Sequence, residues 1–139
     1  MRMRHLSFLS GALLGFLCGV MTMKVEASDP NNEIYCMAQN IYFEAGNQPL
    51  AGKIAVSQVV LNRVEHYAYP DTVCGVVYQA KLRTNWKGEM VPKINACQFS
   101  WYCDGKSDVI HDTNKDYFGE LLLLTNDIID GTMTVIDIT

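Results

Sequence analysis

The 139-residue chain has no surplus of basic residues outside its first 27 positions. Those positions hold three of the 11 Lys and Arg residues and one of the 15 Asp and Glu residues, so the other 112 positions carry 8 basic and 14 acidic side chains. Binding to a nucleic-acid backbone requires Lys and Arg side chains that neutralise phosphates. The acidic balance therefore argues against a nucleic-acid partner.

The sequence also lacks internal repeats, low-complexity segments and any linker that would divide the part after residue 27. A disordered chain and a repeat array are poor interpretations, because 49% of the residues are hydrophobic and no period recurs. A length of 139 residues supports one compact domain at most. We expect a single, monomeric domain over residues 28–139.

Residues 1–27 are typical of an export signal. Arg2 and Arg4 precede an uncharged run over residues 6–23, and small residues at Val25 and Ala27 fit a cleavage site. Such a run is also close to the minimum for a bilayer span, so an uncleaved or later released inner-membrane anchor is the alternative. The basic start predicts that the domain is exported to the periplasm or cell envelope in either case.

Cysteine spacing gives no zinc signature, because no Cys-x-x-Cys pair is present. The exported part has an even number of cysteines, namely Cys36, Cys74, Cys97 and Cys103. An oxidising compartment favours two disulfides, and three pairings are possible. A cysteine nucleophile with His66 or His111 is a weaker alternative, and we expect both histidines at the surface. No metal or cofactor is expected.

Hydrophobic spacing predicts a mainly α-helical domain with little strand. The first expected helix begins at Ser28–Pro30 and ends at Gly46, and the second covers residues 50–64. The second is apolar on most sides, which predicts that it is the buried central helix. The other expected elements are a short helix at 72–79 capped by Asp71, a loop or irregular hairpin at 80–96, a short strand or extended run at 98–102, and a helix from a Thr113–Asp116 capping box to Gly131.

Glu44 is a candidate general acid. It continues the apolar series Ile34, Met37 and Ile41, so the spacing predicts a carboxyl on the buried face of the first helix. Partial desolvation and the negative end of the helix dipole would both favour the protonated form that a general acid needs. The alternative is an exposed carboxylate at a fraying helix end.

A second candidate site lies between Cys97 and Cys103. Aromatic rings beside polar groups suit sugars, which present apolar C–H faces and hydroxyl rims. The alternative is an aromatic core segment pinned by one disulfide. The substrate-binding candidates in this block are Gln98, Ser100, Trp101 and Tyr102.

Four ordered blocks closely resemble the SleB/CwlJ-type cell wall hydrolases, which include spore cortex-lytic enzymes and phage endolysins. The blocks are Ile41-Tyr-Phe-Glu-Ala45, Gln48-Pro-Leu-Ala-Gly-Lys-Ile-Ala-Val-Ser-Gln-Val-Val-Leu-Asn-Arg-Val64, Pro70-Asp-Thr-Val-Cys-Gly-Val-Val-Tyr-Gln79 and Cys97-Gln-Phe-Ser-Trp-Tyr-Cys-Asp-Gly105. Together they run in order along nearly all of the exported part.

The resemblance implies a mainly α, lysozyme-like fold of the α+β type. It further implies a lytic transglycosylase that cleaves peptidoglycan between N-acetylmuramic acid and N-acetylglucosamine. In the family's pattern Glu44 matches the catalytic acid, and Gln98 and Ser100 match polar residues of the cleft. Sugar stacking on Trp101 and Tyr102 is our own inference from the residue types.

The chain departs from the family pattern at two places. Glu44-Ala-Gly-Asn-Gln48 stands where relatives write Glu-Ala-Arg-Gly-Glu, and Val135-Ile-Asp-Ile-Thr139 stops before a further segment that usually lines the cleft. We therefore keep a second interpretation, a catalytically inactive peptidoglycan-binding module or truncated remnant.

Overall fold

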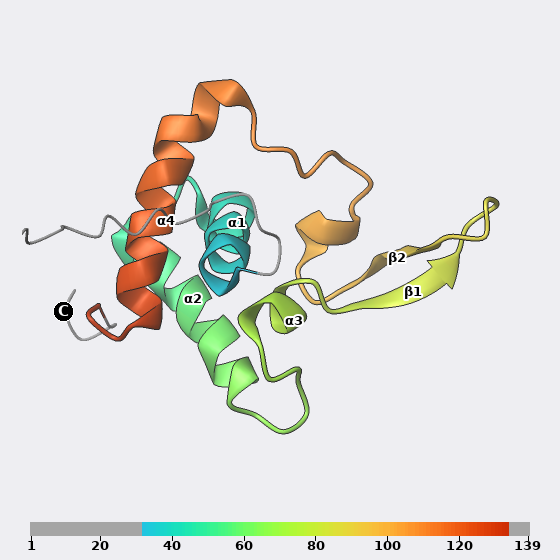
Figure 1. Cartoon of the computed structure of the whole chain (residues 1–139), viewed down its shortest axis with the longest axis horizontal. Coiled ribbons are helices and arrows are strands. Elements are labelled where there is room, and N and C mark those ends of the chain that lie inside the picture. The colour runs from blue at the N-terminus through green and yellow to red at the C-terminus, as the bar shows by residue number, and fades with distance from the viewer. Residues whose placement is uncertain (1–31, 134–139) are drawn as a thin grey trace, which may run out of the picture.

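The computed structural model describes residues 32–133, and both the predicted 1–27 segment and residues 134–139 lie outside them. Within these residues, four α-helices and two short 3₁₀ helices accompany a small two-stranded sheet, which projects from one side of the helices in an α+β arrangement (Figure 1). The elements in chain order are α1 (Glu33–Ala45), α2 (Leu50–Val64), α3 (Val73–Val77), β1 (Ala80–Thr84), β2 (Met90–Cys97), the 3₁₀ helices η1 (Ser100–Cys103) and η2 (Asp112–Asn114), and α4 (Lys115–Ile129). The expected α+β class is confirmed.

Helix α1 is the central element of the core. Asn32 caps it, because its side-chain oxygen accepts from the backbone N–H groups of Ile34 and Tyr35 at 2.9 and 3.4 Å. The predicted start at Ser28–Pro30 falls outside the described residues. Buried residues occur almost all round the helix: Cys36, Met37, Ala38, Gln39, Asn40, Ile41 and Ala45.

Helix α2 has the predicted bounds, but the prediction that it is the buried central helix is wrong. Only Ile54, Ser57 and Val60 are buried, and Val59 remains 44% exposed. The reason is that α1 receives α4, α2 and α3 on different sides, whereas α2 packs with one face only. The largely apolar composition of α2 therefore does not distinguish a central helix from one that packs through a single face.

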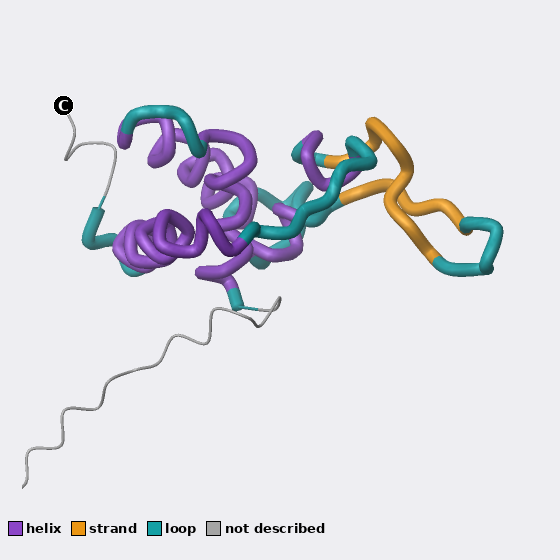
Figure 2. The backbone as a smooth tube through the Cα atoms, turned by 90° about the horizontal axis from the view of Figure 1, so that it is seen from above, coloured by secondary structure: helices purple, strands orange, loops and turns teal. Residues whose placement is uncertain are grey.

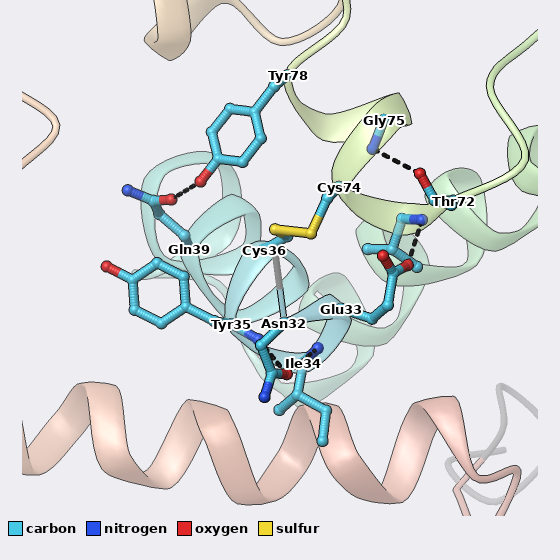
Figure 3. Close-up of a disulfide and its surroundings, with 11 residues drawn as sticks. Asn32, Glu33, Ile34, Tyr35, Cys36, Gln39, Thr72, Cys74, Gly75 and Tyr78 are labelled. Atoms are coloured by element: carbon cyan, nitrogen blue, oxygen red, sulfur yellow. Dashed lines mark hydrogen bonds between the residues drawn. A yellow bond between two sulfur atoms is a disulfide. The ribbon is translucent and has the colours of Figure 1, made fainter. Parts of the chain in front are cut away.

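A disulfide between Cys36 and Cys74 joins α1 to the short helix α3 (Figure 3). Thr72 caps α3 by accepting from the Gly75 N–H at 3.0 Å, so the predicted cap at Asp71 is one residue early. The Glu33 carboxylate makes a second connection between α1 and α3, because it accepts a hydrogen bond from the backbone N–H of Val73 at 2.5 Å. The α3 segment is therefore fixed to the start of α1.

Strands β1 and β2 form an antiparallel hairpin that extends away from the helices (Figures 1 and 2). The irregular-hairpin alternative for residues 80–96 is confirmed. Pairs such as Leu82–Pro92 and Thr84–Met90 set one register, and a bulge shifts it before Ala80 pairs with Cys97. Asn95 lies within that bulge and has a positive φ of 57°.

The 3₁₀ helix η1 follows β2, so the strand or extended run predicted over residues 98–102 is wrong from Ser100 onward, although Phe99 is extended. Helix η1 turns Trp101 and Cys103 into the core, with 6% of each side chain exposed. The second disulfide, between Cys97 and Cys103, closes this turn. An alternation of aromatic and polar residues here reflected a tight turn rather than a pleated strand.

Helix α4 packs along α1 with Phe118, Leu121, Thr125 and Ile128 buried. Its start differs from the predicted Thr113–Asp116 capping box, because Asn114 occupies the cap position without a side-chain cap bond. Gly131 ends the segment with φ of +80°, as its position predicted. None of the helices within residues 32–133 has the length and apolarity needed to cross a bilayer.

Candidate active site

A pocket of about 440 Å³ lies where the end of α1, the turn to α2 and the start of α4 meet. Its walls are mostly polar and aromatic, and Glu44 is the one carboxylate among them. The lining residues are Tyr42, Phe43, Glu44, Gly46, Asn47, Gln48, Asn114 and Tyr117.

Glu44 lies at the rim of this pocket, on the last turn of α1. The prediction that it occupies the buried face of the helix is wrong, because its side chain is exposed. The buried series continues from Ile41 by four residues to Ala45, which is 2% exposed, rather than by three to Glu44. The carboxyl is consequently directed at solvent beside the pocket and is accessible to a bound molecule.

Two hydrogen bonds from the α4 region fix the pocket walls. The Tyr117 hydroxyl donates to the backbone oxygen of Gly46 at 2.5 Å. Asn114 Nδ2 donates to the Tyr42 hydroxyl oxygen at 2.8 Å. Because each bond spans about 70 residues of sequence, α4 holds the end of α1 in place.

Lys53 stabilises the turn from the α2 side. Its ammonium group donates to the backbone oxygen of Gln48 at 2.6 Å and lies 5.8 Å from the centre of the Tyr117 ring. A cation over an aromatic face is attracted by the ring quadrupole. The turn between α1 and α2, which lines the pocket, is thus held by side chains from both α2 and α4.

Trp101 contacts the pocket wall through Phe43. Its ring stacks on Phe43 with centroids 4.8 Å apart, and its indole N–H donates to the buried side-chain oxygen of Asn40 at 2.9 Å. With 6% of its surface exposed, the indole offers little area to a sugar. The structure gives Trp101 a packing role next to Glu44, which matches the core alternative for this block.

Gln98 lies at the base of the β-hairpin and contacts the other end of α2. With its amide oxygen facing the guanidinium, it accepts from Arg63 Nη2 at 2.9 Å and Nη1 at 3.0 Å. Arg63 stands 13 residues after Leu50, so roughly 20 Å of helix separates it from the α2 end at the pocket. Gln98 instead lines a second pocket, of about 400 Å³, with residues 79–81 and 95–97.

The remaining two predicted substrate contacts are near the surface. Ser100 is exposed, and Tyr102 is half-buried against Tyr78 with ring centroids 4.9 Å apart. Neither residue lines the Glu44 pocket. The structure therefore brings none of the four predicted substrate-binding side chains to that pocket, although Trp101 reaches it through Phe43.

Burial, and then the neighbouring Tyr35, raise the pKa of the Tyr78 hydroxyl to about 12. This hydroxyl donates to the side-chain oxygen of Gln39, and Gln39 Nε2 in turn donates to the backbone oxygen of Asp108 at 3.2 Å. Partial burial and then the nearby Asp104 raise the pKa of the Asp108 carboxyl. The neutral tyrosine is therefore a structural donor that holds the end of α3 to α1, and Gln39 connects α1 to the η1–η2 loop.

No local feature of the sequence indicates that Asn114 and Tyr117 line a pocket. Both belong to the start of a predicted helix, about 70 positions from the residues to which they are hydrogen-bonded. Contacts over such separations depend on how α4 packs on α1. Periodicity within a short window does not contain that information.

The family model described as Cell Wall Hydrolase matches residues 47–134, which is more than half of the chain. The match includes Asn47, Gln48, Asn114 and Tyr117 of the pocket and begins three residues after Glu44. No solved structure matches the chain.

Curated relatives carry the name spore cortex-lytic enzyme. The chain is 36% identical to that of Oceanobacillus iheyensis over 66 residues, or 48% of this chain and 24% of the relative. It is 42% identical to that of Halalkalibacterium halodurans over 55 residues, or 40% and 17%. The Bacillus subtilis protein is 39% identical over 49 residues, or 35% and 16%. The chain thus spans less than a quarter of these relatives, and by the family match it belongs to the cell wall hydrolases.

Proposed function

We propose that this chain cleaves the glycan strand of peptidoglycan, with Glu44 as the catalytic acid. The observation that carries the proposal is an accessible carboxyl at the rim of a pocket. The walls of this pocket are held by hydrogen bonds between segments about 70 residues apart in the sequence. Family membership and the spore cortex-lytic relatives support a cell wall substrate. The pocket also offers hydroxyl, amide and aromatic groups of the kind that contact sugars.

In the proposed reaction, Glu44 protonates the glycosidic oxygen between N-acetylmuramic acid and N-acetylglucosamine. The C1–O bond breaks, and the N-acetylglucosamine hydroxyl leaves with that proton. The ionised Glu44 then removes the proton from the C6 hydroxyl of N-acetylmuramic acid, whose oxygen bonds to C1. The products are a 1,6-anhydro sugar end and a free hydroxyl end, and the carboxyl regains its proton.

A single carboxylate is enough for this route, because the attacking nucleophile belongs to the substrate. That agrees with the pocket, in which Glu44 is the one acidic side chain. Hydrolysis would instead require water to attack C1, which enzymes with two carboxylates commonly activate through the second. We therefore favour lytic transglycosylation over hydrolysis.

The exposure of Glu44 requires the substrate to complete the site. In the free protein the Glu44 side chain is exposed to water. A glycan strand that covers the pocket would exclude this water and place the carboxyl next to the glycosidic oxygen. Substrate binding, rather than burial in the free protein, would thus complete the surroundings of the proposed acid.

The fold and location follow from the same interpretation. We propose that residues 32–133 form the lysozyme-like core of a monomeric enzyme exported to the periplasm or cell envelope. Residues 1–27 would act as the export signal, or as an inner-membrane anchor before release. The Glu44 environment and the family match carry this proposal, and it needs no cofactor.

The competing function is a catalytically inactive peptidoglycan-binding module. One observation favours it: the family match starts at residue 47 and leaves Glu44 outside. A binding module would retain sacculi without releasing soluble products.

Purified sacculi incubated with the full chain test the proposal, and mass spectrometry identifies the products. Release of 1,6-anhydro-muropeptides supports transglycosylation, whereas reducing ends indicate hydrolysis and retention without release indicates the module. Glu44→Gln should lower the release rate by about 10²- to 10⁴-fold, the usual contribution of a general acid. Glu65→Gln, a matched change at an exposed carboxylate beyond the end of α2, should release product at the parent rate. Equal rates for the parent and Glu44→Gln would refute the assignment.

A further inference from the structure

The β1–β2 hairpin carries a charge opposite to that of the rest of the described domain. Residues 80–97 contain four basic residues and one acidic residue, whereas the other residues of 32–133 contain four basic and eleven acidic residues. The basic residues of the hairpin are Lys81, Arg83, Lys87 and Lys93. A positive arm is thus attached to a negative body.

The strand register separates apolar from basic side chains on the hairpin. Leu82 pairs with Pro92 and Thr84 pairs with Met90, so these residues share one face. Leu82 and Met90 are 54% and 62% exposed. Ile94, two positions after Pro92, is 57% exposed.

The opposite face is cationic. Arg83 pairs with Val91 and therefore lies on the other side of the ribbon from Leu82. Lys81 precedes Arg83 by two positions and Lys93 follows Val91 by two, so alternation carries this side on to both residues at the edge of the bulge. All three basic side chains are exposed. The hairpin is therefore an amphipathic ribbon.

Trp86 is the most distal aromatic residue of this arm, with 89% of its surface exposed. The turn that presents it is firmly bonded. The Asn85 side-chain oxygen accepts from the N–H groups of Lys87 and Glu89, each at 2.9 Å, and the Asn85 N–H donates to the Glu89 backbone oxygen at 2.9 Å. An ordered turn that holds a tryptophan in water points to a partner for that side chain.

The base of the arm is fixed to the body as well. The Gln98 N–H donates to the Gln79 backbone oxygen at 2.8 Å, and the Cys97–Cys103 disulfide lies directly beside it. Both views show the hairpin extending away from the helices (Figures 1 and 2). Five residues of β1 span roughly 17 Å, which exceeds the Debye length of about 8 Å at physiological salt. The tip can therefore meet a negative surface without strong repulsion from the acidic body.

We propose that the β1–β2 hairpin is a docking arm for an anionic phospholipid bilayer. The arm inserts Trp86, together with the hairpin face that holds Leu82 and Met90, into the interface of that bilayer. Tryptophan is enriched at the lipid headgroup level, and basic side chains beside it are attracted to anionic headgroups. An arm with apolar and cationic faces has the distribution of an interfacial segment. The aliphatic side chains distinguish this partner from a glycan. A sugar ring could stack on Trp86, but its small C–H faces would cover less of Leu82, Met90 and Ile94 than lipid chains would.

Tryptophan fluorescence tests the proposal in the full chain, because the protein has two tryptophans and Trp101 is already buried. Vesicles of phosphatidylglycerol should shift the emission to shorter wavelength, and lipids brominated on their chains should quench it. Phosphatidylcholine vesicles should do neither. Trp86→Phe should abolish the response. Residues 6–23 are the same in every variant, so any difference between variants belongs to the hairpin.

A matched pair of charge variants provides the control. Lys81→Glu/Arg83→Glu and Lys106→Glu/Lys115→Glu change the net charge equally, in the hairpin and in the body. The hairpin variant should need at least about tenfold more phosphatidylglycerol for the same shift, since each basic residue contributes about a fivefold gain in binding. The body variant should stay within about twofold of the parent. An unchanged emission with phosphatidylglycerol, equal responses of both variants, or a shift with sacculi but not with vesicles would each overturn the proposal.

Discussion

The Tyr117 hydroxyl donates a hydrogen bond of 2.5 Å to the backbone oxygen of Gly46, which stands 71 residues earlier in the chain. Gly46 follows the last turn of α1, two positions after Glu44. This bond therefore connects the packing of α4 to the turn beside the proposed acid. The arrangement explains how a pocket rim made by a short turn keeps a defined shape.

Tyr117→Phe removes this bond and leaves the aromatic packing in place. We expect the free energy of unfolding to fall by about 1 kcal/mol, the usual net value of a hydrogen bond. The release of soluble glycan from sacculi should fall by a larger factor than global stability explains, because the Gly46 turn positions Glu44. Urea unfolding and release assays on the same preparation measure both effects. Tyr67→Phe is the control, since Tyr67 is 96% exposed; an active Tyr117→Phe protein with parent kinetics would contradict the positioning role.

The bond between the Trp101 indole and the Asn40 side chain should couple the two residues energetically. Both residues are buried, and the distance between Trp101 Nε1 and Asn40 Oδ1 is 2.9 Å. Asn40→Ala leaves the indole N–H without its acceptor, which should cost about 1–3 kcal/mol of unfolding free energy. A double-mutant cycle with Trp101→Phe should give a coupling of about 0.5–3 kcal/mol. Additive losses in the cycle would show that the bond contributes nothing beyond packing.

The two disulfides should differ in how much they stabilise the protein. The Cys36–Cys74 pair closes a loop with a sequence separation of 38, and the Cys97–Cys103 pair one with a separation of 6. Loop-closure entropy predicts losses of about 4 and about 2 kcal/mol when each pair is replaced by alanine. Urea unfolding of the two double variants measures the order of the losses. Peptide mapping without reduction should recover the same two pairs, and a crossed pair would contradict the structure.

Much of the local structure could be predicted from the sequence, but its burial could not. The predicted bounds of α2 and the predicted end of α4 were correct, because each depends on residues that are close in sequence. Which helix is central depends on how many elements pack against it. Val59 and Ile41 are both aliphatic residues in regular helices, yet one is 44% exposed and the other is fully buried.

The same limit applied to the candidate site. Glu44 could be identified as a candidate because a charged residue follows an apolar series at helical spacing. In the structure the buried face of the helix continues to Ala45 instead, and Glu44 is exposed. The residue types predict either sugar stacking on Trp101 or a place in an aromatic core segment, and the structure shows the indole against Phe43 and Asn40 within the protein. Residue type indicated what these side chains can contact. Tertiary packing determined which partner they have.

Tyr78 should make the protein less stable at strongly alkaline pH. Burial, together with Tyr35, raises its pKa to about 12 in the folded protein, against 10.0 in the unfolded chain. The folded state therefore holds the proton more tightly, so this contribution is complete below about pH 10 and is lost as the pH rises toward 12. Ionisation would also remove the hydrogen bond that the hydroxyl donates to Gln39. Urea unfolding between pH 8 and pH 12 should thus show a fall in unfolding free energy that Tyr78→Phe reduces and Tyr67→Phe does not; the same pH slope in the parent and in Tyr78→Phe would show that Tyr78 is not responsible.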